Sequence, residues 1–93
     1  MTTERFASIW DALEDAPHEA ANMRLRSMLM RALKEHIARD GLTQKQAAQH
    51  LGVTQPRISD LMRGKIGLFG LDMLITMATA AGLQVDLRIS RAA

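Results

Sequence analysis

The amino-acid sequence predicts an all-α fold, a single domain of about five helices followed by a short C-terminal β-strand. Three observations support this prediction. Apolar residues recur three and four positions apart through most of the 93 residues, which is the spacing of amphipathic helices. The six glycines stand between these stretches, where helices end. Apolar and polar residues alternate only near the C-terminus, and this alternation is typical of a strand.

The first predicted helix is short and acidic. Its apolar residues follow the i, i+3, i+4, i+7 pattern and are Phe6, Ile9, Trp10 and Leu13. Asp15 can cap a second helix that has Pro17 in its first turn, where a missing N–H has no cost. We expect this second helix to run to about Arg39 and to end at Gly41.

The third and fourth predicted helices are short and close together. The third spans about 43–51 and opens with a capping box, in which Thr43 and Gln46 satisfy each other's backbone donors. It ends before Gly52, which can turn the chain sharply. The fourth spans about 54–62 and also begins with a capping threonine.

The fifth predicted helix ends at Gly82 and buries the stripe Leu71, Leu74, Ile75 and Ala78. A strand is predicted at 83–90, because Val85, Leu87 and Ile89 alternate with polar residues. The sequence contains no second strand, so we expect the strand to pair with its equivalent in a two-fold dimer, through Val85, Leu87 and Ile89. A frayed or partly helical tail is the alternative.

Charge is segregated along the chain. Residues 1–22 hold one base against five acids, a net charge of −4, whereas residues 24–65 hold nine bases against three acids, a net charge of +6. This asymmetry favours a polyanionic partner at the middle of the chain, although a solvated surface explains it equally well. The single domain 1–93 thus divides into an acidic helical segment at 1–22, a core at 23–82 and the strand at 83–90.

Several classes of function are disfavoured. There are no cysteines, and the three histidines lack ligand spacing, so we expect no metal and no cofactor. No nucleophile motif or glycine-rich phosphate loop is present, which argues against an enzyme. The absence of cysteine, of a signal sequence and of an apolar run of about 18 residues indicates a cytoplasmic protein without a membrane span.

The two helices at 43–51 and 54–62 are separated by little more than Gly52 and Val53, which is the arrangement of a helix-turn-helix motif. Ala47 and Ala48 are small enough to let the second helix cross close to the first. Ile58 and Leu61 point back into the core, so the opposite side of the second helix faces outward.

The stretch TQKQAAQHLGVTQPRISDLMRGK, residues 43–65, resembles the Cro/phage-repressor type of helix-turn-helix, the XRE family, with the motif at 43–63. The flanking sequence from about residue 9 to residue 89 is similar to HigA-type antitoxins. The resemblance implies a sequence-specific DNA-binding regulator that represses its own toxin–antitoxin operon and inhibits a RelE-like toxin. A phage-type repressor without a toxin partner is the alternative.

The candidate DNA-binding residues lie on and around the second helix of the motif: Gln44, Thr54, Gln55, Pro56, Arg57, Ser59, Asp60, Arg63 and Lys65. Gln55 can bond adenine and Arg57 guanine, each through two hydrogen bonds. The resemblance implies that Gln55, Pro56 and Asp60 face bases. Pro56 offers only apolar contact, and Asp60 either accepts from cytosine or pairs with Arg57 or Arg63.

Phosphates are expected at the start of the first motif helix, at Gln44, and at the basic residues Arg63 and Lys65. The acidic N-terminal stripe has two interpretations. Phe6, Ile9, Trp10 and Leu13 either pack on the chain's own helices or bind a basic protein partner, which the resemblance identifies as a RelE-like toxin.

Overall fold

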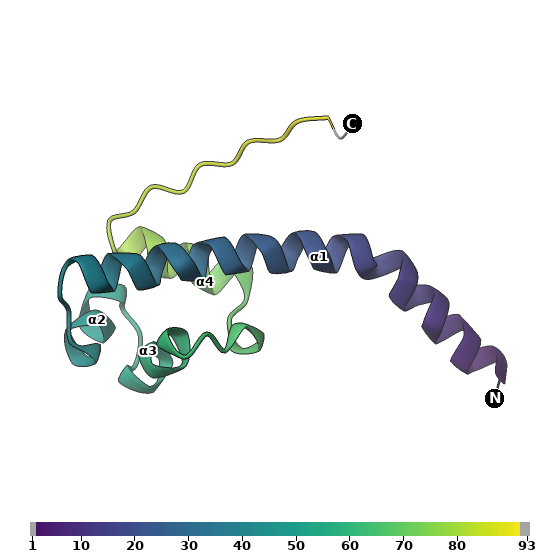
Figure 1. Ribbon diagram of the computed structural model, residues 1–93, viewed down its shortest axis with the longest axis horizontal. Helices are drawn as coiled ribbons and strands as arrows, with labels where there is room; N and C mark the ends of the chain where they lie inside the picture. The colour runs from purple at the N-terminus through teal and green to yellow at the C-terminus, as the bar shows by residue number, and fades with distance from the viewer. Residues whose placement is uncertain (1, 92–93) are drawn as a thin grey trace.

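The computed structural model describes the backbone of residues 2–91 and the side chains of residues 18–91. Its elements are α1 (Thr2–Arg39), α2 (Gln44–Leu51), α3 (Gln55–Met62), the 3-10 helix η1 (Ile66–Leu68) and α4 (Leu71–Ala80). The shorter helices gather against the C-terminal half of α1, and the last described residues run back alongside it as an extended segment (Figure 1). The predicted all-α class is confirmed.

The hydrophobic core joins α1 to every other helix. On α1, Met30, Leu33 and Ile37 are buried at i, i+3 and i+7, one face of the helix. The other large, fully buried side chains come from the remaining helices and from the loop after η1: Leu51, Ile58, Leu61, Phe69, Leu74 and Met77. No described polar side chain is buried, so the core itself is entirely apolar.

The predicted break between a first and a second helix is wrong. α1 continues without interruption from Thr2 to Arg39 and includes Pro17, so the structure has four α-helices rather than five. A proline removes one backbone hydrogen bond, and the good helix-forming residues on both sides of it outweigh that loss. The predicted end is confirmed: Gly41 has a φ of +62°, and the Leu42 N–H bonds to the Ile37 carbonyl at 3.1 Å.

The helix starts around the turn at Gly52 follow the sequence signals. Thr43 accepts a hydrogen bond from the Gln46 amide at 3.1 Å, and the Gln46 side chain accepts one from the Thr43 amide at 2.9 Å. Gly52 has a left-handed φ of +71° and ends α2. Thr54 then caps α3 by accepting from the Arg57 amide. Local chemistry therefore determines where both helices of the motif begin.

The buried stripe of α4 differs in part from the prediction. Leu74 and Ala78 are buried as expected, but Met77 completes the stripe, while Ile75 is 38% exposed and Leu71 is half-buried. Positions 74, 77 and 78 share one helix face, and 71 and 75 lie at its edge beside α1. None of the described helices has the length and apolar character needed to cross a membrane.

The C-terminal strand predicted at 83–90 is not formed within the described chain. Residues 83–91 are extended but belong to no sheet, and the last backbone hydrogen bond runs from the Leu83 amide to the Ala78 carbonyl. A strand needs a second strand to satisfy its backbone, and residues 2–91 supply none. The extended conformation agrees with the predicted alternation, but residues 84–91 form no backbone hydrogen bonds with the rest of the described chain.

Candidate nucleic-acid interface

α3 is held against α2 so that one side of it faces outward. Three residues, 52–54, join the two helices, and the small, buried Ala47 and Ala48 of α2 leave room for α3 to approach. Ile58 and Leu61 of α3 are each 0% exposed, which fixes the inward face. Figure 1 shows α3 at the lower edge of the molecule, across α1 from the extended C-terminal segment.

The N-terminal end of α3 is the most exposed part of this helix. Thr54, Gln55 and Pro56 are all exposed, while Ser59 and Asp60, one turn further along, are half-buried. The structure therefore places the predicted residues Gln55, Pro56 and Ser59 on the outer side of α3. An α-helix of this kind fits the major groove of DNA with its N-terminal residues next to the base edges.

Arg57 does not share this outward direction. Its Nη1 donates to the Leu68 carbonyl at 3.0 Å, and its guanidinium lies over the Phe69 ring, 5.5 Å from the centroid. The side chain is half-buried in this position. The predicted guanine contact would require Arg57 to leave both partners, so the described geometry gives it a supporting position beneath α3.

A second arginine holds the same loop and was missed by the sequence reasoning. Arg26 of α1 donates through Nη1 to the carbonyl oxygens of Ile66 and Phe69, at 3.2 and 3.4 Å. Three carbonyls of the loop after α3 are therefore bound by two guanidinium groups from different helices. Forty residues separate Arg26 from Ile66, and no sequence spacing links them.

Asp60 pairs with neither of the two arginines considered from the sequence. Its Oδ1 lies 3.6 Å from Nζ of Lys65, just after the end of α3. This pair neutralises part of the positive charge expected at Lys65. Because both side chains are partly exposed, the pair contributes little to stability and can separate when a phosphate approaches.

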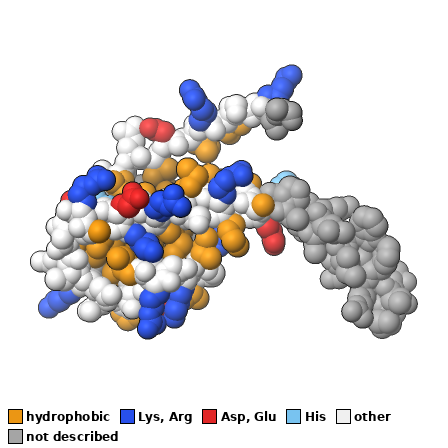
Figure 2. Space-filling view, in the orientation of Figure 1, with side chains coloured by type: hydrophobic (Ala, Val, Ile, Leu, Met, Phe, Trp, Pro, Cys, Tyr) orange, Lys and Arg blue, Asp and Glu red, His pale blue; other side chains and the backbone are white. Residues whose placement is uncertain are grey.

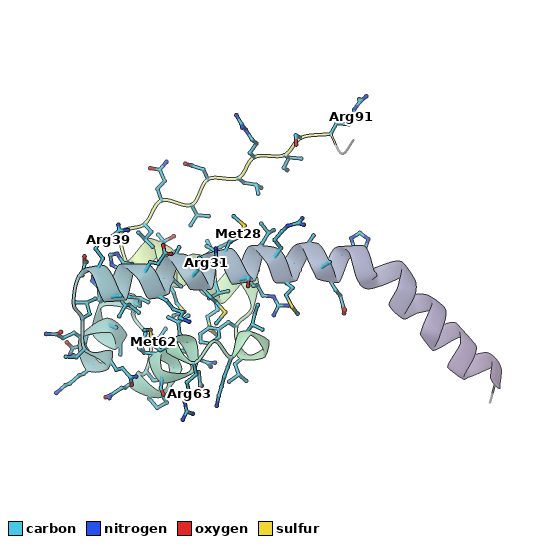
Figure 3. All side chains as sticks on the ribbon, viewed as in Figure 1. Met28, Arg31, Arg39, Met62, Arg63 and Arg91 are labelled. Atoms are coloured by element: carbon cyan, nitrogen blue, oxygen red, sulfur yellow. The ribbon has the colours of Figure 1, made fainter. Side chains whose placement is uncertain are left out.

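Basic and polar groups flank the exposed side of α3. Arg63 is exposed at its C-terminal cap and points away from the body at the lower edge of the molecule (Figure 3). Gln44 and Lys45 are exposed in the first turn of α2. Figure 2 shows Lys and Arg side chains gathered at the same lower edge. The structure thus brings Gln55, Pro56 and Ser59 together with nearby cations on one surface.

The remaining candidate residues lie elsewhere. The side chains of Phe6, Ile9, Trp10 and Leu13 are outside the described residues. Val85, Leu87 and Ile89 are exposed, far from α3. His50, near the end of α2, lies against His36, with the two Nε2 atoms 3.2 Å apart. In the part of the chain with described side chains, no three potential ligands gather to hold a metal.

Comparisons with known proteins agree with this geometry. A family model described as a helix-turn-helix domain matches residues 12–90. A solved structure assigned by its name to the XRE family of transcriptional regulators has a TM-score of 0.74 and is 31% identical in sequence. The match covers 80% of this chain and 83% of that one. No curated protein matches the sequence.

Proposed function

Because this chain belongs to the XRE-type family of helix-turn-helix domains, we propose that it is a sequence-specific DNA-binding transcriptional regulator whose α3 enters the major groove. One observation carries the proposal. Ile58 and Leu61 on the inner face of α3 are fully buried, whereas the residues at its N-terminal end are exposed and basic side chains lie nearby. This is the form that a helix needs to reach base edges while the domain rests on the backbone.

Base recognition falls to the outer residues of α3 in this proposal. The amide of Gln55 bonds N6 and N7 of an adenine, and the ring of Pro56 contacts a neighbouring thymine methyl. Ser59 and Asp60 lie one turn further on, where Asp60 reaches a cytosine only by leaving Lys65. Gln55 is therefore the main source of sequence preference.

Phosphate contacts position the domain. Gln44 and Thr54 lie at the starts of α2 and α3, where unpaired backbone N–H groups favour an anion. Arg63 and Lys65 add positive charge beyond the other end of α3. Arg57 contributes indirectly, because its contacts with Leu68 and Phe69 fix α3 against the loop that follows.

The regulator acts as a homodimer in this proposal. A two-fold dimer presents two copies of α3 about 34 Å apart, one turn of DNA, so the target is an inverted repeat. Val85, Leu87 and Ile89 support dimerisation, because they are exposed apolar side chains on an extended segment whose backbone has no described partner.

A role as the antitoxin and autorepressor of a HigBA-like system extends this proposal. The support is the acidic segment 1–22, with its net charge of −4 and the apolar residues Phe6, Ile9, Trp10 and Leu13. Acidic charge repels nucleic acid and attracts a basic protein such as a RelE-like toxin. A stand-alone repressor would have no use for such a segment as a partner-binding site.

The DNA-binding proposal is tested by titrating labelled duplex from upstream of the protein's own gene and measuring fluorescence anisotropy. The variant R63A is expected to bind more weakly, because a phosphate contact is lost. The matched control is R39A, since Arg39 is an exposed arginine at the end of α1, away from Arg63 (Figure 3). Equal weakening in both variants would show only a diffuse charge effect.

The antitoxin proposal needs a separate test. A small, basic reading frame next to this gene supplies the candidate toxin, and its absence would favour the stand-alone repressor. With purified toxin, W10A is expected to lose toxin binding and to retain DNA binding. The reverse result would show that Trp10 serves the fold instead.

A further inference from the structure

An apolar groove of about 650 Å³ lies on the side of the molecule away from α3, between α1, α4 and the extended C-terminal segment. Its walls include Leu25 and Met28 of α1 and Ile75 of α4, which are 38%, 60% and 38% exposed. Val85 and Leu87 of the C-terminal segment line the same groove. Apolar surface of this extent, open to water, is typical of an interaction site.

The C-terminal segment presents two different faces. Val85 and Leu87 turn toward the groove, and Ile89 continues the same alternation at 85% exposure. Gln84 and Asp86 also border the groove, and the Gln84 amide donates to the Asp86 carboxylate at 3.1 Å. Because side chains alternate along an extended segment, we infer that these two lie on the opposite side from Val85 and Leu87. From residue 84 onward, no backbone hydrogen bond to another described residue is present. The segment thus has the form of a strand that lacks its neighbour.

We propose that this neighbour is the same segment of a second copy, paired antiparallel about a two-fold axis that passes through Leu87, with the resulting two-stranded ribbon lying over the groove. The inference rests on the dimer of the proposed function and adds its register. In such a ribbon, residues directly opposite each other point to the same side. Leu87 then faces the partner's Leu87, and Val85 faces the partner's Ile89, all on the groove side.

The charges of Asp86 and Arg88 favour this register over the neighbouring ones. With the axis at Leu87, Asp86 lies opposite Arg88 of the partner subunit, and Arg88 lies opposite Asp86 of the partner subunit. Two symmetric ion pairs form on the outer face, where opposite charges across strands are favourable. Moving the axis to Asp86 places it against the partner's Asp86, and moving it to Arg88 places that residue against the partner's Arg88. The two neighbouring registers, with the axis at Asp86 or at Arg88, therefore bring like charges together.

The register can be read by disulfide trapping, because the chain contains no cysteine. A residue on the two-fold axis faces its own copy with Cα atoms about 4.5–5.5 Å apart, which a disulfide spans. We expect L87C to form covalent dimers readily in a glutathione buffer and D86C and R88C to form them much more slowly. Faster trapping of D86C or R88C would overturn the register.

Charge exchange gives a second measurement. D86R and R88D each replace two ion pairs by two like-charge contacts, so the dissociation constant of the dimer in sedimentation velocity is expected to rise about tenfold. The double variant D86R/R88D restores opposite charges and is expected to recover the original value. No recovery would contradict the pairing of Asp86 with the partner's Arg88. All three variants leave the buried core intact.

Failure of this inference is distinguishable from failure of the proposed function. If the wild-type chain stays monomeric at all concentrations, or if L87C traps no dimer while the wild type is dimeric, the tail interface is overturned. DNA binding is measured separately on a duplex that holds a single half-site, which one monomer can occupy. Binding to that duplex without dimerisation would leave α3 as the DNA-reading helix and remove only the tail interface.

Discussion

Arg57 lies on the helix proposed to read DNA, yet its guanidinium is turned toward the protein. It bonds the Leu68 carbonyl at 3.0 Å and stacks on Phe69, whose ring is 1% exposed. A charged hydrogen bond together with a cation–π contact at a partly exposed site is worth about 1 kcal/mol. We therefore expect Arg57 to affect DNA binding only through the position of α3.

The variant R57A tests this role. We expect its free energy of unfolding to fall by about 1 kcal/mol and its affinity for operator and random DNA to fall by similar factors. Urea denaturation and anisotropy measure the two effects. Unchanged stability with a loss confined to the operator would instead assign Arg57 a direct contact with guanine.

Gln55 is expected to behave in the opposite way. It is exposed at the first position of α3, so Q55A should leave stability unchanged. Loss of a two-bond contact to adenine costs about 1–3 kcal/mol of discrimination at one base pair. Competition between the operator and single-base variants measures this preference. A uniform loss across all sequences would make Gln55 a backbone contact.

At the scale of elements, the turn at Gly52 sets the direction of α3. Gly52 has a φ of +71°, and a Cβ at this position would meet nothing within 4 Å. G52A is therefore expected to lower the free energy of unfolding by about 1–2 kcal/mol, because alanine is strained at a positive φ and not because its side chain would meet a neighbour. Gly67 is equally uncrowded and does not have a positive φ, so G67A is the control and should not destabilise the fold. Equal denaturation midpoints for the two variants would contradict this account.

Features of the helices that depend on neighbouring residues could be predicted from the sequence, whereas those that depend on distant residues could not. The starts of α2 and α3 were predictable because Thr43, Gln46 and Thr54 act on backbone groups within three residues. The continuity of α1 through Pro17 was not predictable from the sequence. It depends on whether the helix-forming residues on both sides outweigh the hydrogen bond that the proline removes. The direction of Arg57 was also out of reach, since it depends on a loop eleven residues away that carries Phe69. For the C-terminal segment, the alternation of apolar and polar residues predicted the extended conformation. The described residues contain no second strand with which the segment can pair.

At the scale of the whole molecule, the segregation of charge predicts a strong dependence of DNA binding on salt. If each subunit contacts about four phosphates, a dimer releases the counterions of about eight, and the logarithm of the binding constant falls with the logarithm of salt concentration with a slope of about −7. Anisotropy titrations at several salt concentrations measure this slope. A slope near zero would show that the basic residues around α3 do not contact phosphate.

The proposed dimer interface and the proposed DNA surface lie on different sides of the molecule, with α1 between the C-terminal segment and α3 (Figure 1). Deleting residues 84–93 should therefore convert the dimer to a monomer without unfolding the core. In sedimentation velocity, the truncated chain is expected to show the monomer mass of about half the dimer mass, since a two-fold pair has lost its contact. An unchanged mass would place the interface elsewhere.

The central claim is that α3 reads DNA from its exposed N-terminal end, and selection of binding sites from a pool of random duplexes tests it most directly. The wild-type protein is expected to enrich an inverted repeat with half-sites about 10 base pairs apart. Q55A is expected to lose the preference at one position in each half-site. Enrichment of no sequence, or of the same motif by wild type and by a variant with Gln55, Pro56 and Ser59 all replaced by alanine, would contradict the claim.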